Sequence, residues 1–148
     1  MLSGTPVLTD VVPAADAMPS VHSMSGMHTL LDLGDDEYTK GRPHPMIDPS
    51  VRDRALLEAL SSDKSAIILL DVVIGYGSHH DPAGHLVSFL SRNPQSERPP
   101  IVASVTGTDY DPQNRSLQIA KLEAAGVHVA PTNAEAATWA LAAVQSRM

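Results

Sequence analysis

The sequence predicts an α/β domain built on a doubly wound parallel sheet of about four strands, with helices on both faces. Two observations predict it. From residue 28 onward, short apolar runs alternate with longer stretches that have the period of an amphipathic helix. Continuous apolar strands that alternate with helices are typical of a parallel sheet covered on both sides, and right-handed crossovers make such a sheet doubly wound.

Four apolar runs are the expected strands. The clearest is 66–74, AIILLDVVI, because it is long and rich in β-branched residues. The strands are expected at 28–33, 66–74, 100–106 and 127–130.

Helical periodicity fills the segments between and after the strands. The apolar positions that define the four helices are Val51, Ala55 and Ala59; Ala83, Leu86, Val87 and Leu90; Leu117, Ala120 and Ala124; and Ala134, Ala137, Leu141 and Val144.

The helix starts support this order independently. Asp48-Pro49, Asp81-Pro82 and Asp111-Pro112 each put a capping carboxylate before a proline whose missing N–H costs nothing in a first turn. Thr132 to Glu135 fits a capping box before the last helix, and Gly126 suits the C-terminal cap of the third.

Residues 1–27 have no sustained period and are interpreted as an N-terminal arm or linker, which leaves 28–148 as the domain. Three of the 12 prolines lie in this arm. Most of the others lie at helix starts, in loops or at the start of a strand of the βα repeat, so the high proline content does not indicate disorder.

Composition excludes several classes of protein. Ten Lys and Arg against 17 Asp and Glu, with a net charge of -7, argue against nucleic-acid binding. No apolar run approaches the roughly 18 residues of a membrane span, and the N-terminus lacks the basic start of a secretory signal. The absence of Cys agrees with the cytoplasmic location that we expect.

Ligands of open parallel sheets bind beyond the carboxyl ends of the strands, so the loops there are the expected site. In the loop after the second strand, Gly75, Gly77 and Ser78 are able to present N–H groups to a phosphate or carboxylate. A plain strand-to-helix turn is the alternative, and the expected helix cap Asp81 would repel an anion.

The same loop carries a histidine cluster. His79, His80, Asp81 and His85 have the residue types of a divalent metal site, but neighbouring histidines hardly aim at one ion. Surface histidines near a subunit contact are the alternative, and no metal ligand is assigned.

The loop after the first strand displays a histidine in a stiff segment. Pro43 and Pro45 fix two φ angles around His44, and Arg42 beside it is a candidate anion clamp. An ordered loop that covers the sheet edge or packs on a partner subunit is an equal alternative.

Two carboxylates, Asp32 and Asp71, fall inside apolar strand patterns. An ionised carboxylate there needs a partner, so we expect Asp71 to be hydrogen-bonded within the core or at the end of the sheet.

Three segments resemble the C-terminal region of FdrA proteins, which are similar to succinyl-CoA synthetase. They are LLDLGDDEYTKGRPHPMIDPSVRDRALLEAL, ILLDVVIGYGSHHDPA and IVASVTGTDYDPQ. The resemblance covers about residues 28–145 and implies a flavodoxin-like CoA-ligase domain. It also implies acyl-CoA synthetase chemistry, or the oxamate carbamoyltransferase activity linked to FdrA-type proteins in allantoin degradation.

Two departures limit what the resemblance implies. The synthetase carries a phosphorylated histidine in a GHAG stretch after the strand that corresponds to IVASVTG, but this chain has Thr108 to Arg115 there and no histidine. No CoA-binding or ATP-grasp region is expected, since about 27 residues precede the first strand.

We therefore expect a stand-alone or split FdrA-type domain that is inactive alone and binds no cofactor alone. A homo-oligomer, or a CoA-binding or ATP-grasp-like partner subunit, would supply CoA, ATP or carbamoyl phosphate. His44 and His79 are the candidate catalytic residues, with Arg42, Gly75, Gly77 and Ser78 for the anion. The alternatives are a noncatalytic subunit-interaction module and, more weakly, a receiver-like domain, which would need a suitably placed Lys in the later loops.

Overall fold

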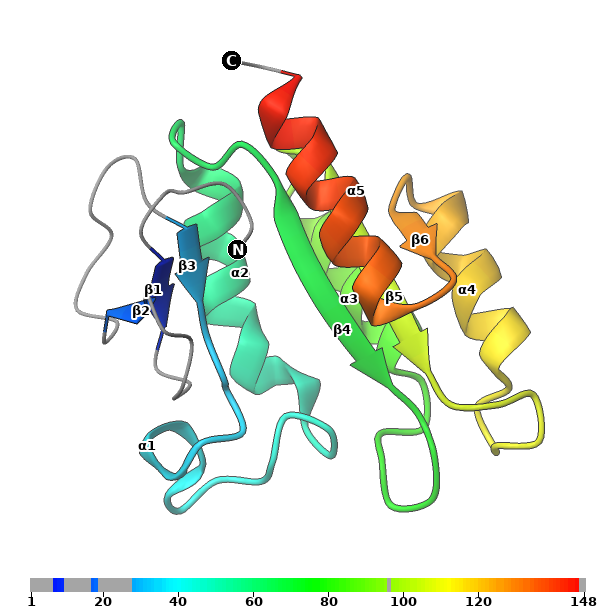
Figure 1. Cartoon of the computed structure of the whole chain (residues 1–148). Coiled ribbons are helices and arrows are strands. Elements are labelled where there is room, and N and C mark those ends of the chain that lie inside the picture. The colour runs from blue at the N-terminus through cyan, green and yellow to red at the C-terminus, as the bar shows by residue number, and fades with distance from the viewer. Residues whose placement is uncertain (1–6, 10–16, 19–27, 96, 147–148) are drawn as a thin grey trace. The chain divides into compact units, whose positions relative to one another are not determined.

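The structure is a computed structural model, and the chain divides into two compact units, Met1–Arg42 and Pro43–Met148 (Figure 1). The residues that it describes are 7–9, 17–18, 28–95 and 97–146. Within them, no helix has the length and the apolar character needed to cross a bilayer.

The first unit contains a small parallel sheet. Its strands are β1 (Val7–Thr9), β2 (Ala17–Met18) and β3 (His28–Leu30), in the order β2-β1-β3. A one-turn helix, α1 (Asp36–Thr39), begins at Asp35, whose carboxylate accepts a hydrogen bond from the Glu37 N–H.

This sheet changes the interpretation of the N-terminal third. The strand predicted at 28–33 exists as β3, but it pairs with β1 and not with the strand at 66–74. The predicted arm contains β1 and β2, which are too short to show a hydrophobic period. The rest of that arm lies outside the described residues. Asp32 follows β3 and is exposed, so it is not in a buried strand.

The second unit has the predicted layered architecture around a three-stranded parallel sheet. Its strands are β4 (Ile68–Val73), β5 (Ile101–Thr106) and β6 (His128–Ala130), in the order β4-β5-β6. Its helices are α2 (Asp53–Ser61), preceded by a 3-10 turn at Pro49–Arg52, α3 (Pro82–Arg92), α4 (Arg115–Ala124) and α5 (Asn133–Gln145).

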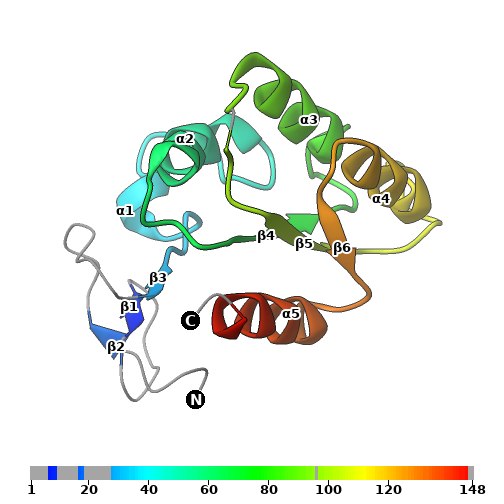
Figure 2. The same ribbon diagram turned by 90° about the horizontal axis from the view of Figure 1, so that it is seen from above.

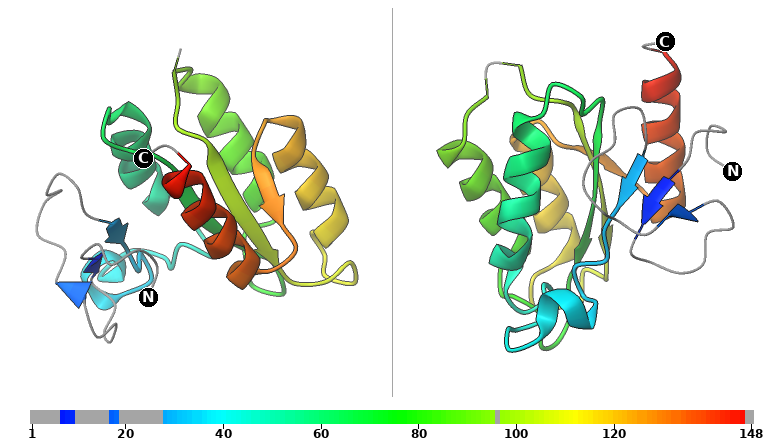
Figure 3. Two further views of the ribbon diagram at one scale, coloured as in Figure 1. Left: turned by 45° about the horizontal axis from the view of Figure 1, so that its top comes forward. Right: turned by 90° about the vertical axis from the view of Figure 1, so that its left-hand side faces the viewer.

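Helices cover both faces of this sheet. Figure 2 shows α2, α3 and α4 on one face and α5 on the other, and the views in Figure 3 agree. The core lies mainly between the sheet and α3, where Val72, Leu86 and Ile101 are almost fully buried. The strand β4 is less covered than its apolar sequence predicts, because it is an edge strand and Leu69 and Val73 on one side are about 40% exposed.

In three helices the side that faces the core differs from the side predicted. Helix α2 buries Leu56 and Leu60, and α5 buries Ala136 and Ala140, none of which was predicted. In α3 the predicted residues Ala83, Leu86 and Leu90 are buried. In α4 the predicted face is wrong: Leu117 is 61% exposed, and the helix buries Gln118 and Leu122 instead. A polar Gln takes the core position because its amide has hydrogen-bond partners there.

Three of the four predicted helix caps are confirmed. The carboxylates of Asp48 and Asp81 accept from backbone N–H groups of the following turns, and the Thr132 hydroxyl accepts from the Glu135 N–H. Gly126 has φ +78° and ends α4 as predicted.

The cap predicted at Asp111-Pro112 is wrong. Helix α4 begins three residues later, at the Asn114 cap, whose side chain accepts from the Leu117 N–H. Asp111 instead closes the preceding turn, because its Oδ2 accepts from both the N–H and the hydroxyl of Thr108, at 2.6 and 2.9 Å.

Candidate functional site

Two loops of the second unit lie beyond the carboxyl ends of β4 and β5, where the sequence predicts the site. The β4 loop is 75–81, and the β5 loop is 107–114. Each begins with a glycine in a positive-φ conformation, Gly75 at +142° and Gly107 at +141°. Other residues meet this conformation only with strain, so both chain reversals depend on glycine.

The β4 loop is held by a residue of the β5 loop. The amide of Gln113, which is only 7% exposed, donates from Nε2 to the Gly75 carbonyl, the Ser78 hydroxyl and the His79 carbonyl, at 2.9 to 3.0 Å. Its Oε1 accepts from the Gly75 N–H at 3.2 Å. One side chain therefore fixes the loop that the sequence assigns to anion binding.

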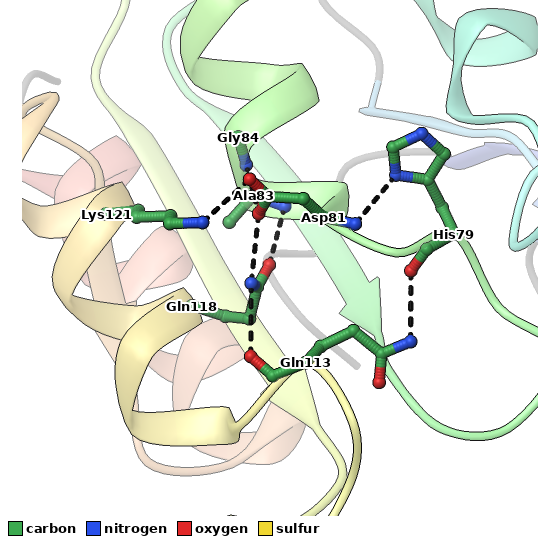
Figure 4. A network of polar contacts seen from close by, with 7 residues as sticks. All are labelled: His79, Asp81, Ala83, Gly84, Gln113, Gln118 and Lys121. Carbon is green, nitrogen blue, oxygen red and sulfur yellow. Dashed lines mark hydrogen bonds and ion pairs between the residues drawn. The ribbon is translucent and has the colours of Figure 1, made fainter.

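A second network closes the start of α3, as Figure 4 shows. The Oδ1 atom of Asp81 accepts from the Gly84 N–H at 3.1 Å and from the Gln118 amide at 3.0 Å. Its Oδ2 atom accepts from the Lys121 ammonium at 2.7 Å. The Gln118 Oε1 accepts from the Ala83 N–H at 2.9 Å, so α4 supplies partners to the first turn of α3.

The charge state of Asp81 follows from these contacts. Partial burial alone would raise the pKa of this carboxyl. Hydrogen bonds from Lys121, Gln118 and the Gly84 N–H outweigh burial and hold the pKa below its ordinary value of 3.8. Asp81 is thus an anion at the N-terminus of α3. A glycine is needed at position 84, because a Cβ there would overlap the Asp81 carboxylate.

The two predicted catalytic histidines have the same local geometry. The Nδ1 atom of His44 accepts from the Met46 N–H at 3.1 Å, and that of His79 accepts from the Asp81 N–H at 3.0 Å. An Nδ1 that accepts carries no proton, so in the neutral ring of each residue the proton is on Nε2. Nε2 is the atom through which either histidine is able to exchange a proton with a ligand.

A backbone contact connects the two histidine segments. The His79 N–H donates to the Met46 carbonyl at 2.7 Å, while the Met46 N–H donates to His44. The segment after Pro43 is therefore tied to the β4 loop, a link that nothing in the sequence marks.

Further histidines and carboxylates surround His79. The His79 ring lies 4.4 Å from the His80 ring and 6.0 Å from the His85 ring, between centroids. The Nε2 of His85 lies 2.9 Å from the Asp53 carboxylate. Hydrogen bonds from Ser50 hold the pKa of Asp48 below its usual range, and His85 and His79 contribute to this electrostatically.

The remaining predicted anion ligands lie in both units, Arg42 in the first and Gly77 and Ser78 in the β4 loop of the second. Arg42 is exposed at the end of the first unit, and its N–H donates to the Thr39 carbonyl. Gly77 is exposed with φ +82°, and its surroundings leave room for a side chain. The Ser78 hydroxyl donates to the Gly75 carbonyl at 2.8 Å.

Asp71 has the hydrogen-bond partners that were predicted, although it is exposed and not in the core. Its carboxylate accepts from the Ser104 hydroxyl at 2.6 Å and from the Asn133 amide at 2.7 and 2.8 Å.

In the described part of the chain, no group of three or more His, Cys, Asp or Glu side chains has an arrangement that could hold a metal ion.

Sequence reasoning missed Gln113, Gln118 and Lys121. Their partners lie 34 to 40 residues away in the chain, so no local pattern connects them. One signal for Gln118 was present in the sequence. Gln118 lies four residues before the apolar Leu122, so the two residues share one face of α4 and Gln118 is a polar residue on the buried face.

The arrangement combines two imidazoles that have Nε2 available for proton transfer with a loop in which the N–H groups of Gly75, Ser78, His79 and Asp81 already have partners.

Comparison with known proteins assigns the family. Residues 9–143 match the family model described as CoA-ligase. An uncharacterized protein of Escherichia coli (strain K12), YahF, is 39% identical over 111 residues, which cover 72% of this chain and 22% of YahF. The chain thus spans about a fifth of the length of this curated relative. The chain belongs to the CoA-ligase family.

Proposed function

We propose that the chain is the CoA-ligase domain of an FdrA-type enzyme that is active only with partner chains or further domains. The chemistry is that of an acyl-CoA synthetase or an oxamate carbamoyltransferase. The observation that carries this proposal is the family match over 9–143 in a chain that spans only 22% of YahF. The remaining parts of such an enzyme would bind CoA, ATP or carbamoyl phosphate.

His44 and His79 are the proposed proton-transfer residues. Their support is geometric: both rings have Nδ1 engaged by a backbone N–H, and Met46 connects the two segments. Each ring is thereby oriented with Nε2 as its exchanging atom, the preorganisation that general acid–base catalysis requires.

The proposed anion ligands are Arg42, Gly75, Gly77 and Ser78. The Gly75 N–H and the Ser78 hydroxyl already have partners, so a phosphate or carboxylate has to compete with Gln113 and the loop itself. This competition agrees with a domain that does not bind the substrate alone. The same proposal places the chain in the cytoplasm, where it works as a homo-oligomer or with a partner subunit.

A noncatalytic interaction module is the second candidate. Asp81 favours it, because its carboxylate already occupies the start of α3 and accepts from Gly84, Gln118 and Lys121. A helix N-terminus that the chain fills with its own anion is not open to an external one.

Reconstitution separates the two candidates. The chain is mixed with the products of neighbouring reading frames, and two activities are measured: formation of acyl-CoA from a carboxylic acid such as succinate, CoA and ATP, and carbamoyl transfer from carbamoyl phosphate to oxamate. We expect His44→Ala and His79→Ala each to lower the rate about 100-fold or more.

His128→Ala is the matched control, because His128 is exposed on β6, away from both loops. Full activity in both loop variants, while the chain is still required for the partners to assemble, would leave only the interaction module. Loss of activity in the control as well would show that the assay reports folding and not the site.

A further inference from the structure

An open cavity of about 710 Å³ runs along α3, outside the predicted anion site. We call it the α3 groove and define it by His79, His80, His85, Ser88, Ser91 and Arg92. It is a shallow depression that is widely open to solvent. All of its lining belongs to the second unit.

One end of the α3 groove gathers three imidazoles. His79 lies within 4.4 Å of His80 and 6.0 Å of His85, between ring centroids. With Nδ1 of His79 accepting from the Asp81 N–H, Nε2 of that ring is a donor. Asp53 accepts from Nε2 of His85 at 2.9 Å and so fixes the orientation of this ring.

The carboxylate of Asp81, beside these imidazoles, is not free to bind a cation. Asp81 also lines the groove, but Lys121 engages its Oδ2, and Gly84 and Gln118 engage its Oδ1. The charge of Asp81 is thus compensated from within the chain. The groove presents imidazole and guanidinium donors, a set that recognises anions, while the Ser91 hydroxyl donates within α3 to the Val87 carbonyl.

The other end of the groove carries a guanidinium. Arg92 lies in the last turn of α3, and its Nε donates to the Ser88 carbonyl at 3.2 Å, which lays the side chain back along the helix. The two terminal amino groups of a guanidinium suit a phosphate in bidentate geometry. Because His85 lies seven residues before Arg92 on α3, about 10 Å of helix separates the two residues.

From this arrangement we propose that the α3 groove binds an elongated ligand that carries phosphate groups, with the imidazoles at one end and Arg92 at the other. The inference goes beyond the proposed function, since it assigns a ligand to the side of α3 and to Arg92, and His79 is the one residue that belongs to both sites. It holds whether the chain is catalytic or an interaction module.

The test is a titration of the full isotopically labelled chain, followed by NMR, with phosphate, pyrophosphate and tripolyphosphate as probes. We expect saturable shifts along α3 and an affinity that increases from phosphate to the longer probes. Arg92→Gln and His80→Gln should each weaken tripolyphosphate binding about fivefold or more, because each removes a charge-assisted hydrogen bond.

Arg54→Gln is the matched control. Arg54 also carries one positive charge, but its side chain is 91% exposed on α2 and pairs with Glu58. Equal losses in Arg54→Gln and Arg92→Gln would overturn the inference, since they would indicate nonspecific attraction. The absence of saturable shifts in α3, or equally tight binding of hexaglutamate, would also overturn it. Because no turnover is measured, these outcomes are independent of the reconstitution experiment.

Discussion

The loops that follow β4 and β5 start with the same sequence features and are held in different ways. Each has a glycine with φ near +140°, Gly75 or Gly107, within two residues of the end of the strand, and an Asp-Pro pair further along. In the β5 loop, Asp111 bonds to Thr108 of the same loop. The β4 loop instead depends on Gln113, Gln118 and Lys121, which come from outside it.

This difference separates a self-contained loop from one whose shape depends on its neighbour. Asp81, at the end of the β4 loop, has partners on α4, which are 37 and 40 residues away. A partner that moved α4 or the β5 loop would therefore change the geometry around His79. The β5 loop is thus held by its own hydrogen bonds, and the β4 loop by those of its neighbours.

Alanine substitution of the two glycines should give the largest difference in stability between the two loops. A Cβ at Gly107 would overlap the buried Ile74 side chain, whereas the nearest atom to a Cβ at Gly75 is Asp111 Oδ1, 3.9 Å away. Backbone strain costs about 1–3 kcal/mol at either site, and overpacking adds about 1–3 kcal/mol at Gly107 alone. Urea unfolding should show Gly107→Ala as the more destabilising variant, and equal losses would contradict the difference in packing.

Gln113→Ala should have the next largest effect. The substitution leaves several polar groups of the β4 loop without their buried partner, at a cost of about 2–3 kcal/mol. It should also shift the amide NMR signals of Gly75 and His79. Asn114→Gly is the control, since it removes a local cap and should cost only a few tenths of a kcal/mol. An unchanged β4 loop in Gln113→Ala would show that the support comes from elsewhere.

The smallest of these effects depends on pH. Because the pKa of Asp81 in the folded chain lies below its ordinary value of 3.8, the unfolded chain takes up this proton first. The stability that Asp81 contributes is complete above about pH 4 and is lost as the pH falls through the folded pKa. Asp81→Asn should cost about 1 kcal/mol at pH 7 and less at pH 3.

The acid dependence of Asp81→Asn should therefore be shallower than that of the unsubstituted chain. Glu123→Gln, which removes an exposed carboxylate from α4, is the control. An acid dependence in Asp81→Asn as steep as in the unsubstituted chain would mean that the contacts with Lys121 and Gln118 contribute nothing.

Local rules predicted the elements that depend on local contacts. Apolar runs placed β4, β5 and β6, and the Asp81-Pro82 pair placed the start of α3. The same pair at Asp111 failed as a predictor of a helix start, because Thr108 offers two donors to that carboxylate three residues earlier. A motif indicates what a side chain is able to cap, and the neighbouring groups decide what it does cap.

The candidate site was predicted only in outline. The loops and the histidines follow from the order of strands and helices. The role of Gln113, the inward turn of Gln118 and the link through Met46 depend on contacts that form only when the sheet assembles. Such contacts have no period or spacing in the sequence, so local patterns do not indicate them.

The most direct test of the account is a titration of the unsubstituted chain into its partner proteins, with acyl-CoA formation and carbamoyl transfer measured at each step. We predict no turnover by the chain alone, little by the partners alone, and a rate that increases with the chain until it saturates near a stoichiometric ratio. A full rate from the partners without the chain, or turnover by the chain alone, would contradict the account.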